Sequence, residues 1–314
     1  MAITAATKTS DFNGFLNPNE AAPIFNEAQR QSVFQQLFRR VPLGINGESI
    51  PVVTSRPTAN WVDEAGQKPA TSMGLGLVPM VPKKLAAIAV MSAEVVRANP
   101  GNFTSQLRTE LAGAFARAFD LAVAYNAGGD GTPAGGPFDY YLNDTSKRVT
   151  LGTAAASSGG LHTDIVNGMK DLIEDGRKLT GFALDDRVEP LLWGAVDSVG
   201  HPVYVNLPTD DVTQAIARPG RLLGRPSFMG DGVGNGSVVA FGGDFTKGAW
   251  GAVGGISYRV STEATVTINN NLVSLWEHNL VAVLAEAEYG FVLADEDAED
   301  FVAYEYDAGS GASA

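Results

Sequence analysis

The segment from Ser49 to Asn126 constrains the fold more than any other part of the chain. It predicts a long extended hairpin that runs directly into one amphipathic helix. The outgoing arm covers Ile50 to Glu64, and an arm of about fifteen residues at roughly 3.3 Å each reaches about 50 Å, well beyond a typical strand. We therefore expect this ribbon to project from the body of the protein.

The return arm is predicted over Lys83–Ser92, with the Gly-, Pro- and Ser-rich residues 65–82 as the link between the arms. The return arm is apolar on both faces: Leu85, Ala87, Ala89 and Met91 alternate with Ala86, Ile88 and Val90. A lone two-stranded hairpin is at best marginally stable in water, so this apolar surface needs a cover. We infer that another copy of the chain provides it.

Length and charge narrow the class of protein. With 314 residues and 45% hydrophobic residues, the chain is an ordinary globular sequence with a prior of two domains. Its 22 Lys and Arg against 35 Asp and Glu give a net charge of −13, which argues against tight, phosphate-dominated nucleic-acid binding. A weak, non-specific contact with DNA remains compatible with this charge.

Several features are missing from the sequence. The sequence contains no run of about 18 apolar residues, so no membrane-spanning helix is predicted. Met1–Asn13 lacks the basic start and apolar block of a signal peptide. We therefore expect synthesis in the cytoplasm and no membrane contact. Because there are no cysteines, disulfides and thiolate metal sites are excluded, and durability must come from packing and interlocking.

The parts that flank the hairpin are mainly helical. Met1–Pro18 is small and polar, and we expect it to become ordered against a partner. Ala22–Phe38 predicts an amphipathic helix outside the main core. The long helix follows a break at Asn99–Asn102 and ends at Gly128-Gly129. Its apolar stripe comprises Leu107, Leu111, Phe115, Ala118, Ala122 and Tyr125, while Arg108, Glu110, Arg117 and Asp120 lie elsewhere.

Beyond a boundary near Gly160, the pattern changes to short elements. Leu161–Leu179 predicts a helix, and Val188–Val196 a second one. Leu222–Gly236 is turn-rich. Short strands are predicted at 182–184, 202–205, 238–241, 249–253, 256–260 and 264–268, as in an α+β domain with a mixed or antiparallel sheet. Long strands over Leu280–Leu293 and at Phe301-Val302 are expected to pack on the first helix.

This order of elements resembles the major capsid proteins of tailed bacteriophages, which have the Hong Kong 97-type fold. The resemblance covers almost the whole chain, from about Ala21 to Glu305, and lies in the order and lengths of the elements. The residues that carry it are Trp61–Glu64 on the hairpin, Met91–Glu94 after it, Asp120 and Gly128–Pro133 at the end of the long helix, Val281–Val292, Asp295–Ala298 and Phe301-Val302.

The resemblance implies an α+β phage capsid fold with a defined division of the chain. Its parts are an N-terminal arm (1–48), an extended loop (49–92), a peripheral domain (93–160 and 274–306), an axial domain (161–273) and a flexible tail (307–314). The axial domain would meet its symmetry mates at the centres of capsomers.

The implied function is structural. Copies of the chain would form pentamers and hexamers that close into an icosahedral shell around double-stranded DNA, assembled in the host cytoplasm and found in the virion. The implied partners are a portal, a possible decoration protein and a scaffolding protein. We expect the scaffolding protein to be separate, because the arm helix and hairpin start almost at once. Some family members form Lys–Asn crosslinks between subunits, which we do not carry over to Lys68, Lys83 or Lys84.

Trp61 is the residue that most strongly suggests a contact between subunits. A Trp on an exposed ribbon is either a surface accident or an anchor buried by a neighbour, and buried aromatic residues dominate interface energy, so we favour the anchor. Asp63 and Glu64 are placed to meet cations of a neighbour, where they would fix register more than add affinity. The candidate contact residues are Arg56, Trp61, Asp63, Glu64, Lys68, Lys83 and Lys84.

Catalytic, cofactor and metal sites are not predicted. His162, His201 and His278 have no partner at metal-ligand spacing, and no serine-nucleophile motif occurs. The glycines of Gly230–Gly236 lack the Lys-Ser/Thr ending of a phosphate loop and predict a turn. The acidic run Asp295–Asp300 is interpreted as a solvated turn in preference to a calcium site.

Two alternatives stay open at this point. A cellular nanocompartment shell of the same fold would enclose a cargo enzyme in place of DNA. A soluble hydrolase would require clustered acids in a pocket, and would behave as a monomer of about 33 kDa in gel filtration.

Overall fold

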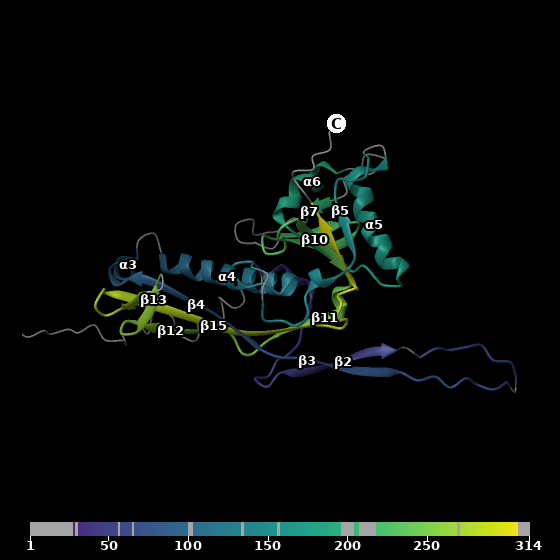
Figure 1. The fold of residues 1–314 in the computed structure, drawn as a ribbon, viewed down its shortest axis with the longest axis horizontal. Helices are drawn as coiled ribbons and strands as arrows, with labels where there is room; N and C mark the ends of the chain where they lie inside the picture. Colours follow the sequence, from purple (N-terminus) through teal and green to yellow (C-terminus); the bar gives the residue numbers. More distant parts are fainter. Residues whose placement is uncertain are drawn as a thin grey trace, which may run out of the picture.

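The computed structural model describes residues 28, 31–55, 57–64, 66–99, 103–132, 135–155, 158–195, 204–206, 218–268 and 271–306. Within these ranges the protein is α+β, as predicted, with two bodies, each built on a sheet, and one projecting hairpin (Figure 1). Residues 1–27, which include most of the predicted arm, and the predicted tail 307–314 lie outside the described residues.

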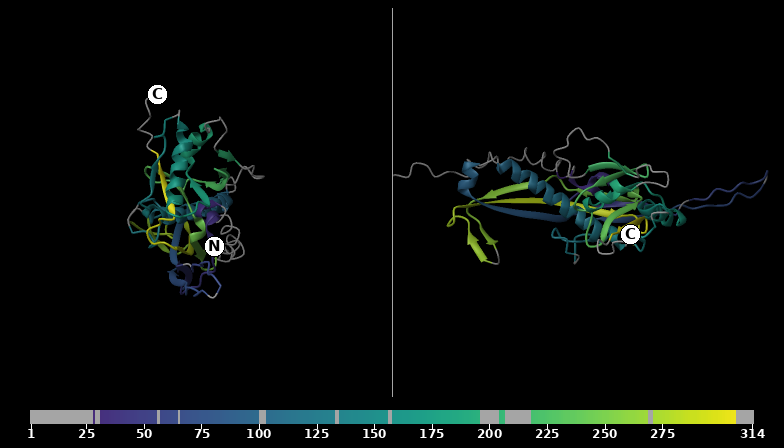
Figure 2. Two further views of the ribbon diagram at one scale, coloured as in Figure 1. Left: turned by 90° about the vertical axis from the view of Figure 1, so that its right-hand side faces the viewer. Right: turned by 90° about the horizontal axis from the view of Figure 1, so that it is seen from above.

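The first body is a five-stranded sheet organised around one long strand, β15 (Leu280–Leu293). One edge of β15 pairs with β4 (Lys83–Ser92), and the other pairs with β11 (Gly248–Ala252) and β12 (Ser257–Ser261), all antiparallel. The two-residue strand β1 (Arg39–Arg40) joins β11 in parallel. Helix α4 (Phe103–Tyr125) runs along the sheet, as Figures 1 and 2 show.

Small elements close the far end of this body. Helix α3 (Ala93–Ala98) follows β4, and the hairpin of β13 (Thr265–Ile268) and β14 (Asn271–Ser274) precedes β15. The Ser92 side chain caps α3, and Asn99 ends it in the left-handed conformation at φ 40°.

The predicted return arm of the hairpin is wrong. Lys83–Ser92 pairs with β15 of the same chain along its entire length, and Gly74–Met80 forms the return arm instead. Leu85 and Ala87 pack against the main core, whereas Ile88, which alternates with them, is 57% exposed. The apolar run is therefore covered on one face by its own chain, because β15 offers an equally long and apolar strand as a partner.

The second body is a mixed seven-stranded sheet with helices α5 (Gly160–Glu174) and α6 (Glu189–Gly194). Its strands, in spatial order, are β5 (Arg148–Thr150), β16 (Phe301–Glu305), β10 (Val238–Gly243), β6 (Gly181–Leu184), β9 (Arg225–Met229), β8 (Arg218–Leu222) and β7 (Tyr204–Asn206). Among the described residues, 3₁₀ turns at Leu142–Asp144, Asp186–Val188 and Phe245–Lys247 connect elements.

Most of the predicted short elements of this body are confirmed, and β8 and β9 are the exceptions. No strand was predicted over β8. The residues of β9 fall in the stretch predicted as turn-rich, where Pro226 and Ser227 weaken the strand signal. β9 nevertheless pairs with both β6 and β8, and Ser227 is only 1% exposed.

The sheets divide the chain differently from the predicted domain ranges. β11 and β12 fall within 161–273, yet they pair with β15 in the first body. β5 and β16 fall in the other predicted range, yet they belong to the seven-stranded sheet. The chain passes between the bodies several times, and local composition does not change where a strand moves from one sheet to the other.

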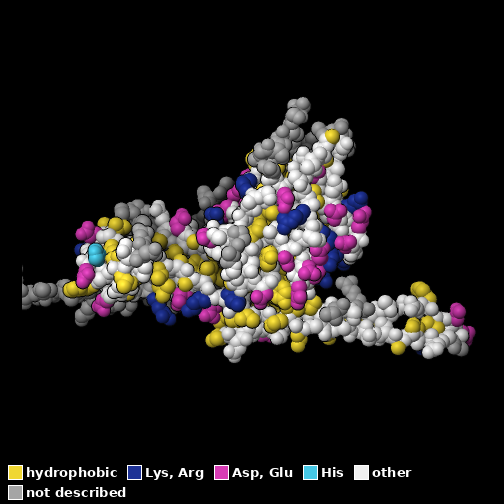
Figure 3. Space-filling view, viewed as in Figure 1, with side chains coloured by type: hydrophobic (Ala, Val, Ile, Leu, Met, Phe, Trp, Pro, Cys, Tyr) yellow, Lys and Arg dark blue, Asp and Glu magenta, His cyan; other side chains and the backbone are white. Residues whose placement is uncertain are grey.

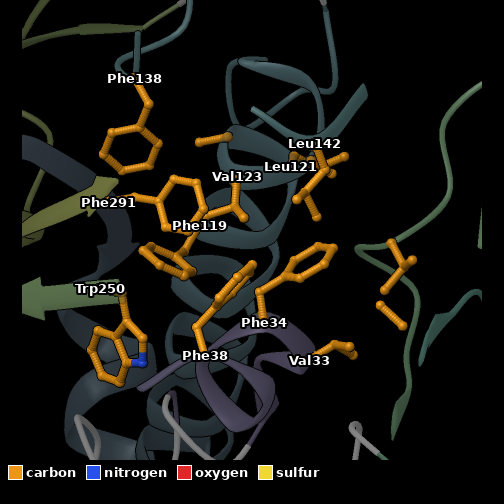
Figure 4. Close-up of a cluster of buried hydrophobic side chains, with 14 of the residues drawn as sticks. Val33, Phe34, Phe38, Phe119, Leu121, Val123, Phe138, Leu142, Trp250 and Phe291 are labelled. Atoms are coloured by element: carbon orange, nitrogen blue, oxygen red, sulfur yellow. The ribbon is translucent and has the colours of Figure 1, made fainter. Parts of the chain in front are cut away.

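The first described helix lies at the centre of the core, which overturns the prediction that it lies outside it. Val33 and Phe34 of α2 (Val33–Leu37) are fully buried. Phe38, which follows α2, contacts Phe291 at a ring separation of 5.1 Å (Figure 4). It also contacts Phe301 at 6.0 Å. The long C-terminal strands therefore pack on the first helix, as predicted, and do so inside the main core.

One buried carboxylate fixes α2 to the long helix. Asp120 of α4 accepts hydrogen bonds from the Ser32 hydroxyl at 2.6 Å and from the backbone N–H groups of Val33 at 2.9 Å and Phe34 at 3.2 Å. The two backbone donors are unpaired N–H groups at the start of α2, which a carboxylate satisfies. Asp120 lies off the apolar stripe of the helix, as predicted, yet it is buried, with only 2% of it exposed.

The end of α4 also differs from the expectation. Asn126, with φ 50°, takes the left-handed position that was predicted for Gly128-Gly129. Its side-chain oxygen accepts a hydrogen bond from Phe138 N–H at 3.1 Å. Asn126 supplies both the left-handed conformation and the hydrogen-bond acceptor, so the helix ends two residues before the predicted stop at Gly128-Gly129.

Burial of Asp120 predicts a pH dependence of stability. Removal from water raises the pKa of Asp120 to about 7, against the opposing effect of its three hydrogen bonds. The native state then binds a proton that the unfolded chain releases near pH 4, so this contribution is complete below about pH 4 and is lost as pH rises to about 7. At about 1.4 kcal/mol per pKa unit, the loss is on the order of 4 kcal/mol at most.

The matched variant is Asp120→Asn, which keeps the shape and cannot ionise. Urea unfolding of the unassembled subunit between pH 4 and pH 8 measures the free energy of unfolding of both proteins. The advantage of the wild type over the variant is expected to shrink as pH rises. A difference that stays constant with pH contradicts the argument.

Candidate assembly surface

The hairpin projects from the body as a two-stranded ribbon (Figure 1). β2 (Glu48–Ser55) and β3 (Gly74–Met80) pair antiparallel from Glu48–Met80 outward. At the ends of the strands, Gly74 N–H donates to the Ser55 hydroxyl at 2.8 Å, and beyond the strands Thr58 N–H donates to the Thr71 hydroxyl at 2.9 Å. At the far end, a turn closes with Gly66 N–H donating to the Asp63 carbonyl at 2.9 Å.

The root of the hairpin is seated on the five-stranded sheet. Ile50 and Met80, on one face of the ribbon, are buried in a cluster with Leu43, Ala249 and Val292. This contact leaves no space for side chains at two paired glycines of the sheet, Gly251 of β11 and Gly290 of β15. A Cβ at Gly251 would lie 2.8 Å from the Val41 carbonyl oxygen, and one at Gly290 would lie 2.8 Å from Met80.

The other face of the ribbon carries an exposed apolar stripe. We define the stripe as the cross-strand pairs Val53–Leu75 and Pro51–Leu77, together with Met73. Leu75 and Leu77 are 63% and 71% exposed. Figure 3 shows hydrophobic side chains along the hairpin, with acidic side chains at its far end. The alternation of Gly and Leu over 74–77 was the period-two signal that could have located β3 in the sequence.

The predicted contact residues fall into two groups. Trp61, Asp63, Glu64 and Lys68 lie together on the distal part of the hairpin, all exposed, with Trp61 fully so at 105%. Arg56 lies outside the described residues.

Lys83 and Lys84 lie instead at the start of β4, in the first body. Lys84 pairs with Glu286 of β15 at 3.1 Å, so it already has a partner within the subunit. The hairpin therefore brings only the distal residues to one surface.

The described residues contain no group of three or more His, Cys, Asp or Glu side chains arranged to hold a metal ion. His162 and His278 lie on different elements, and His201 is outside the described part of the chain. No helix among the described residues is long and apolar enough to cross a membrane.

A small hollow near α4 does gather acidic residues, as the hydrolase alternative requires. It is lined by Glu110, Asp120 and Asp231, among others. Asp120 caps α2 with both carboxylate oxygens, and Asp231 pairs with Arg117 at 3.5 Å. These two acids thus have structural partners. The Gly230–Gly236 segment is a turn, as predicted, and it packs against α4.

The acidic run Asp295–Asp300 joins the two bodies through ion pairs. Arg177 bridges Asp295 at 2.7 Å and Asp300 at 2.8 Å. Lys147 pairs with Glu299 and with Asp175. Partial burial raises the pKa of Glu299, but hydrogen bonds from Lys147 and Ser146 and the Lys147 charge outweigh it and lower that pKa to about 2. The run is therefore a turn held by cations of the same chain.

The sequence matches the phage capsid family over residues 13–304. It is 39% identical to the probable major capsid protein of Mycobacterium phage D29 and 40% identical to that of Mycobacterium phage L5. These alignments cover 96% and 94% of this chain and 93% and 90% of the relatives.

Solved structures share the fold. A chain of Gordonia phage Cozz superposes with a TM-score of 0.64 at 24% identity, covering 88% of this chain and 87% of that one. A chain of Mycobacterium phage Adephagia superposes with a TM-score of 0.65 at 17% identity, covering 97% and 99%. The Hong Kong 97-type fold implied by the order of elements is thereby confirmed.

The close seating of the hairpin root predicts that Gly251→Ala loosens it. Because the added methyl group meets a backbone oxygen, we expect a loss of about 1–3 kcal/mol in the free energy of unfolding. Amide hydrogen exchange of Gly74–Met80 should also become faster. Gly255→Ala is the matched control, because open space surrounds that position. Unchanged exchange in Gly251→Ala contradicts the seating argument.

Proposed function

The chain belongs to the phage capsid family and is a major capsid protein of the virion shell, and we propose that its hairpin lies across a neighbouring copy in that shell. The exposed apolar stripe carries this proposal. Leu75 and Leu77 are more than three-fifths exposed on a ribbon whose own body covers only the opposite face. Contiguous apolar surface of this kind marks an interaction site.

The relatives favour a phage shell over a nanocompartment. The two mycobacteriophage proteins, about 40% identical over nearly the full length, are named as major capsid proteins. We assign this chain the same role, without catalytic activity. Closed symmetry repeats one interface many times, so a modest contact at each hairpin adds up over the shell.

The two sheets support an assignment of the domains within the subunit. We assign the five-stranded sheet with α4 to the peripheral domain, and the seven-stranded sheet with α5 and α6 to the axial domain at the centres of pentamers and hexamers. The extended loop then ends at Met80, where β3 ends. A portal, a separate scaffolding protein and a decoration protein stay predictions from the family resemblance.

Net negative charge supports weak contact with the packaged DNA. At −13 per subunit, an inner wall would not hold phosphates tightly and so would not obstruct the exit of the genome. We expect empty shells to bind a DNA duplex no tighter than about 10⁻⁵ M at about 0.15 M salt, measured by fluorescence anisotropy. Tight binding that weakens steeply with salt contradicts this expectation.

Trp61 tests the role of the hairpin in assembly. Trp61→Ala is expected to weaken each hairpin contact by about 2 kcal/mol or more, because a buried Trp is a typical interface anchor. The yield of shells on a sucrose gradient should fall, while circular dichroism of the subunit stays unchanged because Trp61 is fully exposed.

Trp61→Phe is the matched control, since it keeps an aromatic ring, and it should retain most of the yield. Full assembly of Trp61→Ala contradicts the anchor role.

A further inference from the structure

A groove lies between the hairpin root and the body. It has a volume of about 410 Å³, which is within the usual range of pockets that enclose a small molecule and is ample for one indole ring. Its lining comes from the hairpin (Ile50, Pro51, Val52, Val53, Pro57, Met73) and from the body (Arg39, Thr246–Ala249, Val292–Ala294). Pro51, Val53 and Met73 also belong to the apolar stripe, so groove and stripe are continuous.

The groove combines apolar walls with two cations. Arg39 of β1 and Lys247, just before β11, both line it. Within the described part of the chain, neither forms a salt bridge. Eight other cations in the described part of the two bodies, among them Lys84, Arg148, Arg177 and Arg218, have an acidic partner in the same subunit.

The tip of the hairpin has the complementary chemistry. Trp61 and Val62 are exposed apolar side chains, and Asp63 and Glu64 directly follow them, also exposed. None of the salt bridges found among the described residues involves Asp63 or Glu64. The tip thus offers an apolar anchor beside two anions, and the groove offers an apolar cavity beside two cations.

A subunit cannot fill its own groove with its own tip. From Glu48 to Trp61 the ribbon extends outward by about 40 Å at roughly 3.3 Å per residue, and the root that lines the groove is its fixed end. A tip that enters the groove must therefore belong to a second copy.

We propose that the tip of one hairpin, Trp61 to Glu64, docks in the groove at the root of the hairpin of the next subunit. Trp61 enters between Val52 and Val292, and Asp63 and Glu64 face Arg39 and Lys247. This contact rests on the proposed shell function and specifies where on the neighbour the hairpin is received. Tip and groove are different surfaces, so the contact is head-to-tail and closes into a ring when the rotation allows.

Each part of the contact has its own consequence. Burial of the Trp61 ring contributes most of the affinity, because hot spots concentrate in buried aromatic anchors. The charge pairs at the open side of the groove contribute mainly to register and to the rate of association. The docked tip also lies against Pro51 and Val53, so each subunit that receives a tip has its own hairpin supported at the root.

Thiol crosslinking tests the geometry directly, since the natural chain has no cysteine. The variant Val62→Cys with Ala294→Cys places one thiol on the tip and one in the groove, and leaves all four charges intact. Shells assembled from it are treated with a short bismaleimide and analysed on a denaturing gel. We expect a ladder that ends at covalent pentamers and hexamers.

Two controls establish the direction of the contact. Co-assembly of the two single-cysteine variants should give crosslinked dimers and no higher ladder. Val62→Cys with Val166→Cys, whose second thiol lies on the exposed side of α5 outside the groove, should give no ladder. Shells that form without any ladder overturn the tip-in-groove contact and leave the shell function standing. A chain that stays monomeric overturns both.

Charge reversal provides an independent measurement. Asp63→Lys with Glu64→Lys should lower the yield of shells by about tenfold, and Arg39→Glu with Lys247→Glu should do the same, because like charges then face each other. Combining all four substitutions restores the attraction and should recover most of the yield. Failure of the combined variant to exceed either pair contradicts the proposal, provided that circular dichroism shows folded subunits.

Discussion

The protein depends on holding a long, thin ribbon at one end only. A two-stranded hairpin has little stability of its own, so its direction is set by the contact at its root. Met80 is fully buried there, and the paired glycines Gly251 and Gly290 leave the space that its side chain and that of Leu43 occupy. A contact this close allows little rotation. It therefore fixes where the tip lies, and in the proposed contact this also sets the position of the neighbouring subunit.

Close packing of aromatic side chains also joins the two bodies. Phe38 lies between Phe291 of the first sheet and Phe301 of the second, and α2, which precedes it, is tied to α4 by Asp120. Arg177 and Lys147 add ion pairs to the turn that connects the long strands. A shell subunit must keep one shape under the load of its neighbours, and these shared contacts supply that stiffness without any disulfide.

Elements with a local sequence signal were predicted correctly, whereas the pairing of strands that are distant in sequence was not. The stripe of Leu111, Phe115 and Ala122 predicted α4, and the helix ends within a residue or two of the expected place. The apolar run Lys83–Ser92 was correctly predicted as a strand, but its partner was not, because β15 lies almost 200 residues further along the chain. The groove that contains Arg39 and Lys247 had no sequence signal, since its lining comes from separate segments.

The sequence by itself determined the class of elements, their order and the family, and it placed Trp61, Asp63 and Glu64 on an extended segment. Hydrophobic periodicity and turn residues act over a few positions, so the sequence alone predicts the elements they form. Only the tertiary structure decided which strand returns the hairpin, which sheet each strand joins, and that α2 is buried. Those outcomes depend on which of several apolar surfaces, distant in sequence, pack together in the core. The order of residues along the chain does not specify that choice.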